Sequence, residues 1–436
     1  MKKLLAIFAV CYALANGAPA QTLLDLAQAG TLWSTPANMR AEEMSRGNGS
    51  IILRLPGPHR VAPDLEGGEM LVRCRESDRM RQLVQIMIYN KGDDGPCAPQ
   101  FFVDTVKKVS AALTEATGAE GTRRSIPSSS RLIDLRSWEW RSASTVYCLD
   151  VSSTGKREQL SGNFIRLQLA PAAKSPSGAM AFGSTGAAAS GNAEAFERAT
   201  RQNRVKKAEL KDNVSKLGTG VEIKGIPMVD QGQKGYCAAA VMARLLEYYG
   251  LGTMDQHEMA ATMNTSATGG TSMSAMKSAM ATCGRKFGMR METIDELDSR
   301  DYEHMLKDYN RATRQYGTQK IETPRGVIIG PDTFWLMTDV ETLLASRTAP
   351  PDKLKAWVAK MKRYVDVGVP VIWFVTCGLV SDNEQRGGHM RLIVGYDDVA
   401  GMIYYSDTWG PGHECKAMSV QDAYAITRGR FVLIPL

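Results

Sequence analysis

One low-complexity stretch divides this chain. Residues 170–192, APAAKSPSGAMAFGSTGAAASGN, consist mainly of Ala, Gly, Ser and Pro. A segment of this composition buries too little apolar surface to fold alone, so it predicts a flexible linker. The residues after it, 193–217, are polar and charged and predict a helical spacer, so that 170–217 joins two separately folding parts. We therefore expect one domain over residues 22–169 and another over residues 218–436.

The first twenty residues have the three parts of a signal peptide. A basic start, MKK, precedes the apolar run LLAIFAVCYALA, and the small residues APA (18–20) stand before Gln21. We expect cleavage near Ala20 and export to the periplasm or beyond the cell. The apolar run is too short to span a bilayer and no later segment reaches the required length, so no membrane span is expected.

The charge pattern and the absence of ligand-binding motifs argue against several kinds of partner, whereas the cysteine content leaves the disulfides open. The net charge of +7 falls to +5 when Lys2 and Lys3 are removed, and RVKK (204–207) is the only basic cluster, without interleaved aromatic residues. We therefore expect no nucleic-acid partner. Of eight cysteines, seven remain after loss of Cys11, an odd number that leaves the sulfur pairing open. No structural-zinc spacing and no Gly-rich phosphate loop occurs, so neither a metal nor a cofactor is expected.

Residues 22–169 predict a small α+β domain of unknown role. Apolar residues recur at helical spacing over 101–118, and Gly118 is placed to end that helix. Strand patterns cover 83–89, 144–151 and 163–169. No group of side chains in this domain indicates a chemical function.

Residues 218–436 predict helices first and an antiparallel sheet second, which is also an α+β pattern. We expect helices over 237–250, 255–264, 269–284 and 352–368, and strands over 369–376, 389–396, 401–409 and 429–436. The third helix carries a methionine stripe that indicates core packing. Residues 286–350 are a long insertion without a predicted place in the fold.

A lone cysteine, Cys237, opens an amphipathic helix within DQGQKGYCAAAVMARLLEYYG (230–250). The positive end of a helix dipole stabilises a thiolate, which is the form that attacks carbonyl groups. Gly232 and Gly235 permit a tight turn that returns the side chain of Gln231 to the thiol. There the Gln231 amide and the backbone N–H of Cys237 are expected to stabilise the oxyanion of a tetrahedral intermediate.

The thiol also needs a base, and His389 is the best-placed histidine. His59 lies in the other domain, His257 and His304 lie on polar helical segments, and His413 lies in the loop GPGHE. His389 instead opens a strand directly after RGG, where small residues leave room for the ring. We therefore expect His389 to accept the thiol proton.

Strand pairing links His389 to an acid. In a hairpin around DDVAG with Tyr396 opposite Met402, Asp407 faces Arg391. His389 lies on the same face and diagonal to Asp407, a distance that long side chains bridge. In this register Asp407 orients the imidazole, whereas a slip of one residue would place Asp407 on the other face.

These motifs resemble those of the papain-like cysteine peptidases. DQGQKGYC matches the family's glutamine–glycine stretch, GGHMRLIVGYDD matches its histidine strand, and SDTWG matches its Asn-Ser-Trp-Gly segment. The Cys-Ala-Ala helix start, GGT before the third helix, GVPVI before the histidine and an aspartate as third member are most similar to the bacteriocin-leader (double-glycine) peptidase-like branch. The resemblance covers residues 218–436, and the Cys-Gly-Ser-Cys-Trp context of plant and lysosomal papains is absent.

The resemblance implies a papain-like catalytic domain over its length, with a role for each matching residue. Gln231 is implied as oxyanion donor, Cys237 as nucleophile, His389 as base and Asp407 as orienting acid. Trp409 is implied to shield the His–Asp contact from water.

These features lead us to expect an exported cysteine peptidase that cleaves peptide or isopeptide bonds in a polypeptide substrate. The N-terminal domain is then a propeptide, a substrate-recruiting module or a tether. Two alternatives stay open. One is a cell-wall cysteine amidase or endopeptidase, which also orders Cys before His before a polar residue. The other is a catalytically inactive papain-like domain retained for binding.

Overall fold

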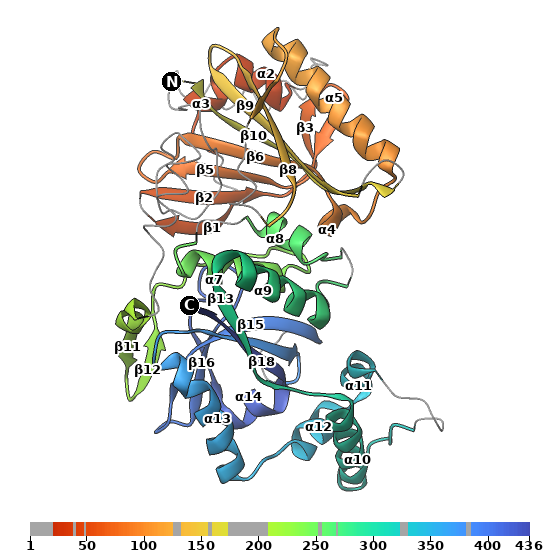
Figure 1. Ribbon diagram of the computed structural model, residues 1–436, viewed down its shortest axis with the longest axis vertical. Coiled ribbons are helices and arrows are strands. Elements are labelled where there is room, and N and C mark those ends of the chain that lie inside the picture. Colours follow the sequence, from red (N-terminus) through yellow and green to blue (C-terminus); the bar gives the residue numbers. More distant parts are fainter. Residues whose placement is uncertain are drawn as a thin grey trace, which may run out of the picture. The chain divides into compact units, whose positions relative to one another are not determined.

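The computed structural model divides the chain into two compact units, Met1–Phe196 and Glu197–Leu436 (Figure 1). It describes residues 21–37, 41–47, 49–124, 132–155, 159–172, 208–251, 255–266, 269–322, 330–380 and 385–436. The predicted signal peptide and most of the predicted linker and spacer lie outside the described residues, so both stay predictions.

The N-terminal unit contains an eight-stranded antiparallel sheet with strand order β1-β2-β5-β6-β10-β9-β8-β7. Its strands are β1 Glu42–Gly47, β2 Ser50–Leu55, β5 Met70–Arg75, β6 Arg81–Asn90, β7 Thr122–Arg124, β8 Leu135–Arg141, β9 Thr145–Thr154 and β10 Ser161–Pro171. A separate hairpin pairs β3 His59–Ala62 with β4 Leu65–Gly67. The three predicted strands are confirmed as β6, β9 and β10.

Helices cover one face of this sheet (Figure 1). They are α2 Leu23–Gln28, α3 Thr31–Ser34 and α5 Pro99–Thr117, whereas the one-turn helix α4 Lys91–Asp94 follows directly after β6. The predicted helix is confirmed as α5, which ends at Gly118 with φ of +69°. It buries Phe102, Val109 and Leu113 against the sheet, because these residues share one side of the helix.

The opposite face of the central strands is polar, yet it is also buried. Nη2 of Arg166 lies 2.8 Å from Oδ2 of Asp150, and the Gln168 amide donates to the Gln85 side-chain oxygen at 2.9 Å. All four residues are at most 4% exposed. Strand alternation therefore separates the apolar and polar faces of β10, but it does not tell whether the polar face is exposed or buried.

The C-terminal unit is a mixed α+β domain in which most helices precede most strands, although β11 and β12 come before the first α-helix (Figure 1). The strand order is β11-β12-β15-β14-β18-β13, with β16 beside β15 and β17 beside β16. The strands are β11 Val214–Leu217, β12 Gly220–Ile223, β13 Met289–Glu296, β14 Val371–Cys377, β15 Gly387–Asp397, β16 Met402–Ser406, β17 Lys416–Ser419 and β18 Thr427–Pro435. The helices are α7 Cys237–Tyr248, α8 Gln256–Thr262, α9 Met273–Phe287, α10 Ser299–Tyr316, α11 Pro331–Met337, α12 Val340–Ser346, α13 Pro351–Val365 and α14 Val420–Ile426.

One expectation about secondary structure is wrong. The described end of the predicted spacer helix is a 3-10 turn, η4 Glu209–Asn213, followed by strand β11. β11 pairs with β12, which pairs in turn with β15. Gly218, with φ of +59°, makes the tight turn between β11 and β12. The hydrogen bonds of this edge hairpin therefore outweigh the helical preference of the polar residues.

The insertion at 286–350 adds one strand and a helical cluster. β13 pairs with β18 at the edge of the sheet, and α10, α11 and α12 gather at one end of the unit (Figure 1). An aromatic core of Tyr302, Tyr309, Phe334 and Trp335 holds these helices together. The insertion thus extends the domain outward from its sheet.

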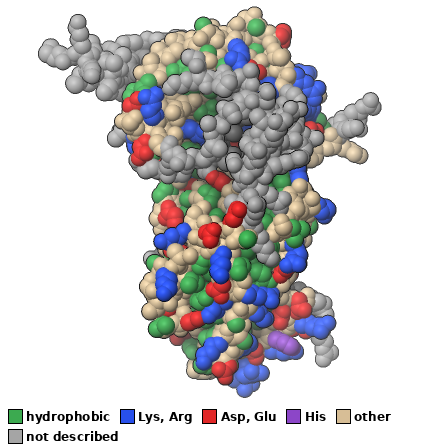
Figure 2. Space-filling model, turned by 60° about the vertical axis from the view of Figure 1, so that its left-hand side comes forward, with side chains coloured by type: hydrophobic (Ala, Val, Ile, Leu, Met, Phe, Trp, Pro, Cys, Tyr) green, Lys and Arg blue, Asp and Glu red, His purple; other side chains and the backbone are tan. Residues whose placement is uncertain are grey.

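Acidic and basic side chains of the described residues are interspersed on the face of the molecule drawn in Figure 2. No helix in the described part of the chain is long and apolar enough to cross a bilayer.

Candidate active site

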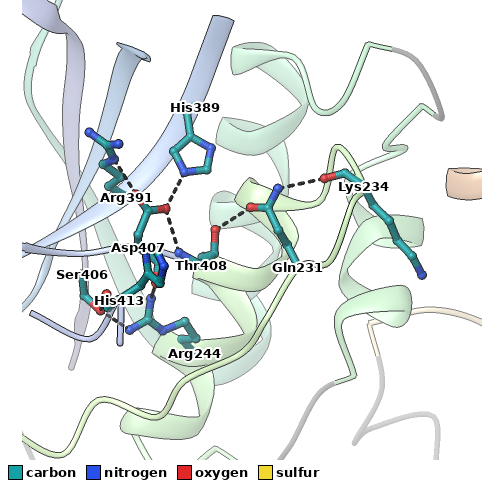
Figure 3. Close-up of polar contacts among 9 residues, drawn as sticks. All are labelled: Gln231, Lys234, Arg244, His389, Arg391, Ser406, Asp407, Thr408 and His413. Carbon is teal, nitrogen blue, oxygen red and sulfur yellow. Dashed lines mark hydrogen bonds and ion pairs between the residues drawn. The ribbon is translucent and has the colours of Figure 1, made fainter. Parts of the chain in front are cut away.

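Three segments that are far apart in the sequence carry the predicted site residues. They are the loop before α7 with the first residue of that helix, the start of β15, and the loop after β16 (Figure 3). α7 packs against β15, which brings the start of the helix to the strand. The site therefore lies where the helical half of the unit meets its sheet.

Cys237 is the first residue of α7. Burial alone would raise the pKa of its thiol, but a hydrogen bond and the charge of His389 lower it, as do the backbone N–H groups of Met390 and Ala238. The net effect is a pKa below the usual value of a thiol. The thiolate form is thus stabilised by an imidazole and by the first turn of a helix.

His389 and Asp407 are joined by a short hydrogen bond. Nε2 of His389 lies 2.5 Å from Oδ1 of Asp407, which leaves Nδ1 for the thiol of Cys237. Burial alone would lower the pKa of His389, but Asp407 and Cys237 raise it to about 9. Burial would likewise raise the pKa of Asp407, but the charges of His389 and Arg391 hold it well below its usual range. Each of these shifts favours the charged form of its group: a thiolate and a carboxylate on either side of an imidazolium.

The hairpin that brings these residues together differs from the predicted one at its turn. Tyr396 lies opposite Ile403, so the predicted pairing with Met402 is wrong. An irregularity before Tyr396 shifts the ladder by one residue, so that Leu392 lies opposite Ser406. The pairing of Leu392 with Ser406 has the predicted register. Asp407, the residue after Ser406, therefore reaches the face of the sheet on which His389 lies. A β-bulge therefore corrects the register within one strand.

The indole of Trp409 covers the His389 ring. The two ring centroids are 4.7 Å apart and the planes are inclined by 20°, so the rings are stacked. The His413 ring packs edge-on against the Trp409 indole, with ring centroids 5.7 Å apart. The Lys416 ammonium lies 5.4 Å from the centroid of the Trp409 ring. Trp409 thus occupies the position that the resemblance implies for a shield.

Gln231 is held in one orientation by two hydrogen bonds (Figure 3). The hydroxyl of Thr408 donates to its side-chain oxygen at 2.5 Å, and its Nε2 donates to the carbonyl of Lys234 at 2.8 Å. The backbone N–H of Gln231 also donates to the Thr408 carbonyl, at 2.8 Å. The amide nitrogen therefore points away from Thr408, with one of its two hydrogens used by Lys234.

Glycines let the backbone segments of the site approach each other closely. Gly410 has φ of +81°, and a Cβ atom there would lie 2.8 Å from Oδ2 of Asp230. A Cβ atom on Gly235 would lie 3.0 Å from the Cα of Gly270, in the loop before α9. The side chains of larger residues would separate the Gln231 loop from its neighbours.

The structure adds two buried arginines that sequence reasoning did not assign to the site. Nε of Arg391 donates to Oδ2 of Asp407 at 2.8 Å, and both side chains are 0% exposed. Arg244 donates to the Asp407 carbonyl and the Pro227 carbonyl, each at 2.7 Å, and to the Ser406 hydroxyl. An arginine within an apolar strand or on the apolar face of a helix is the sequence signal for such a role.

His257 and the cysteines other than Cys237 have different surroundings. His257 is on α8, but it is 1% exposed and packs edge-on against Tyr236, so its helix is not the polar surface that the sequence suggested. None of the seven described cysteines, from Cys74 to Cys415, forms a disulfide. No cluster of three or more His, Cys, Asp or Glu side chains suited to a metal ion occurs among the described residues.

Comparison with models of protein families gives a match over the C-terminal part of the chain. Residues 344–430 match the model of the Peptidase_C39 like family. The matched segment contains His389, Asp407 and Trp409, whereas Gln231 and Cys237 lie outside it. No curated protein matches the chain. The match supports a relation to papain-like and C39 cysteine peptidases and agrees with a mixed α+β fold of the cysteine-peptidase type.

Proposed function

We propose that the chain is a cysteine peptidase that hydrolyses a peptide or isopeptide bond through Cys237, His389 and Asp407. The proposal rests on one observation above all: Nε2 of His389 is 2.5 Å from the buried Asp407 carboxylate, and the same imidazole lowers the pKa of the Cys237 thiol. Such a chain of contacts activates a thiol and returns its proton to a leaving group. The family match over 344–430 supports the same chemistry.

In the proposed reaction, the thiol proton passes to Nδ1 of His389 and the thiolate attacks the carbonyl carbon of the substrate. The backbone N–H of Cys237 and the second amide hydrogen of Gln231 stabilise the resulting oxyanion. The imidazolium then protonates the leaving amine, which departs and leaves an acyl-enzyme. Water, deprotonated by His389, hydrolyses this thioester and releases the thiol. Asp407 holds the imidazole in the orientation that both proton transfers need.

The proposal includes export of the chain after cleavage near Ala20, with the N-terminal unit acting as propeptide, substrate-recruiting module or tether. None of the seven thiols that remain after this cleavage forms a disulfide in the structure. Cys415 is exposed, Cys97 and Cys237 are partly buried, and the other four cysteines are buried.

The test is hydrolysis of polypeptide and cell-wall substrates by the full chain. Wild type is incubated with a peptide library and with purified peptidoglycan, and new amino termini are identified by mass spectrometry. Cys237→Ser should abolish cleavage, whereas Cys415→Ser, which removes an exposed thiol instead, should leave it unchanged. Cleavage of peptidoglycan alone would favour a cell-wall amidase or endopeptidase. No cleavage of either substrate, with unreactive Cys237, would favour a binding module.

A further inference from the structure

Asp407 lies between two groups that are positively charged in the proposed resting state. His389 contacts Oδ1, and Nε of Arg391 donates to Oδ2 at 2.8 Å. His389 and Arg391 are two residues apart on β15, so their side chains leave the same face of the strand. The Arg391 guanidinium also lies over the rings of Tyr405, at 4.7 Å, and Trp409, at 5.7 Å. It is therefore fixed in place by an ion pair and by aromatic contacts.

Arg391 changes the charge of the site. With Arg391, the state with a Cys237 thiolate, a His389 imidazolium and an Asp407 carboxylate carries no net charge. Without Arg391, the same three groups carry one net negative charge, and Arg244 is then the buried cation that interacts with Asp407. Burial of unbalanced charge is unfavourable, so the site would then hold an additional proton up to a higher pH.

Other charged groups near Asp407 are placed differently. Arg244, on α7, donates to the Asp407 backbone carbonyl, and its charge also interacts with Asp407, whereas Arg391 pairs with the carboxylate directly. Electrostatic interactions also connect Asp407 with His413, and His413 with the remaining charges of the loops nearby, which are Lys416, Glu414 and Asp230. Among the described side chains, the ion pairs of the Asp407 carboxylate are those with His389 and Arg391.

We infer that Arg391 is a positioning residue that sets the pH range of the active site, because its fixed charge balances Asp407. The inference rests on the proposed function, since it assigns a role within the same site. Arg391 lowers the pH at which the Cys237 thiolate forms and the pH at which the His389 imidazolium is lost. It acts through Asp407 and does not contact the thiol.

The experiment measures the rate of Cys237 alkylation by iodoacetamide against pH in the full chain, by peptide mass spectrometry. Arg391→Gln removes the charge but keeps an N–H donor, and Arg391→Lys keeps the charge. Arg430→Gln is the matched control, because Arg430 is also 0% exposed and is paired with Asp295 in the same sheet. Circular dichroism establishes that each variant is folded.

We expect the midpoint of thiolate formation to rise by about one pH unit in Arg391→Gln, the effect of one charge at short range across a protein interior. Arg391→Lys and Arg430→Gln should keep the wild-type midpoint. An unchanged midpoint in Arg391→Gln would overturn the inference, and so would an equal rise in Arg391→Lys. If neither Arg391 variant folds, the inference also fails, because a residue with an electrostatic role in the site is replaceable without loss of the fold.

The same titration separates this inference from the proposed function. A wild-type protein whose Cys237 reacts only at the pH of an ordinary thiol would overturn both. A wild-type protein with a low-pH thiolate and an Arg391→Gln variant that matches it would overturn the inference alone.

Discussion

The hydroxyl of Thr408 is expected to set the orientation of the oxyanion donor. Thr408 is 0% exposed and Gln231 is 8% exposed, so Thr408→Val keeps the shape of the site but leaves the Gln231 side-chain oxygen buried without its 2.5 Å donor. The amide can then rotate its nitrogen away from the substrate. Thr408→Ser keeps the hydroxyl and serves as the matched control.

The magnitude follows from the cost of a lost buried hydrogen bond. An unsatisfied buried acceptor costs ~1–3 kcal/mol. If this free energy is lost in the transition state, kcat falls about 5- to 150-fold, since each ~1.4 kcal/mol is a factor of ten. Complete loss of an oxyanion donor lowers kcat by about 10²–10³, which sets the upper limit.

The assay is steady-state hydrolysis of a cleaved peptide by wild type, Thr408→Val, Thr408→Ser and Gln231→Ala. We expect a fall in kcat for Thr408→Val with little change in KM, and a near wild-type value for Thr408→Ser. In a Gln231→Ala background, Thr408→Val should have no further effect, because the two residues act as a unit. A Thr408→Val enzyme with wild-type kcat, or effects that multiply in the double variant, would refute this reasoning.

Three further predictions concern the same site. Gly410→Ala should lower the free energy of unfolding in urea by more than Gly412→Ala, because both glycines have positive φ but only Gly410 has a carboxylate oxygen within 2.8 Å of an added Cβ; equal losses would contradict this. Asp407→Asn should move the alkaline fall in kcat/KM below its wild-type position near pH 9, because Asp407 raises the pKa of His389 to about 9 and burial lowers it once the carboxylate is gone; an unmoved or upward-shifted limb would count against the assignment. Arg244→Met should lower the free energy of unfolding by about 2 kcal/mol or more, because two buried acceptors and one part-buried acceptor lose their donor, and a loss under about 1 kcal/mol in urea unfolding would exclude this role.

Local periodicity was sufficient for most elements of the C-terminal unit. The helices at Cys237 and Met273 and the strand at Val371 have long, regular apolar patterns, and each forms within a few residues of its predicted start. The insertion was harder, because α10 places a few aromatic residues such as Tyr302 and Tyr309 among many charged ones. α10 is stabilised by packing against α11 and α12, and a local sequence pattern does not contain these contacts.

The site was only partly predictable for a similar reason. Motif spacing identifies Cys237, His389 and Asp407 as candidates, since each belongs to a short segment. The bulge that corrects the hairpin register depends on contacts between strands and leaves no local signal apart from Gly395, where a Cβ atom would clash with the backbone of β12. The sequence identifies Arg391 only as the residue opposite Asp407 in the predicted hairpin. It does not indicate a role in the site, because an arginine on a strand is usually exposed.

The pH dependence of Cys237 alkylation in wild type and His389→Ala is the most direct test of a thiolate–imidazolium pair between Cys237 and His389. Both proteins are treated with iodoacetamide between acidic and alkaline pH, and modification of Cys237 is followed by peptide mass spectrometry. If this pair forms, wild type is modified rapidly well below the ordinary thiol pKa of about 8.5, and His389→Ala loses this low-pH reactivity. Slow modification of wild type below that pH, or identical profiles for the two proteins, would contradict a thiolate–imidazolium pair.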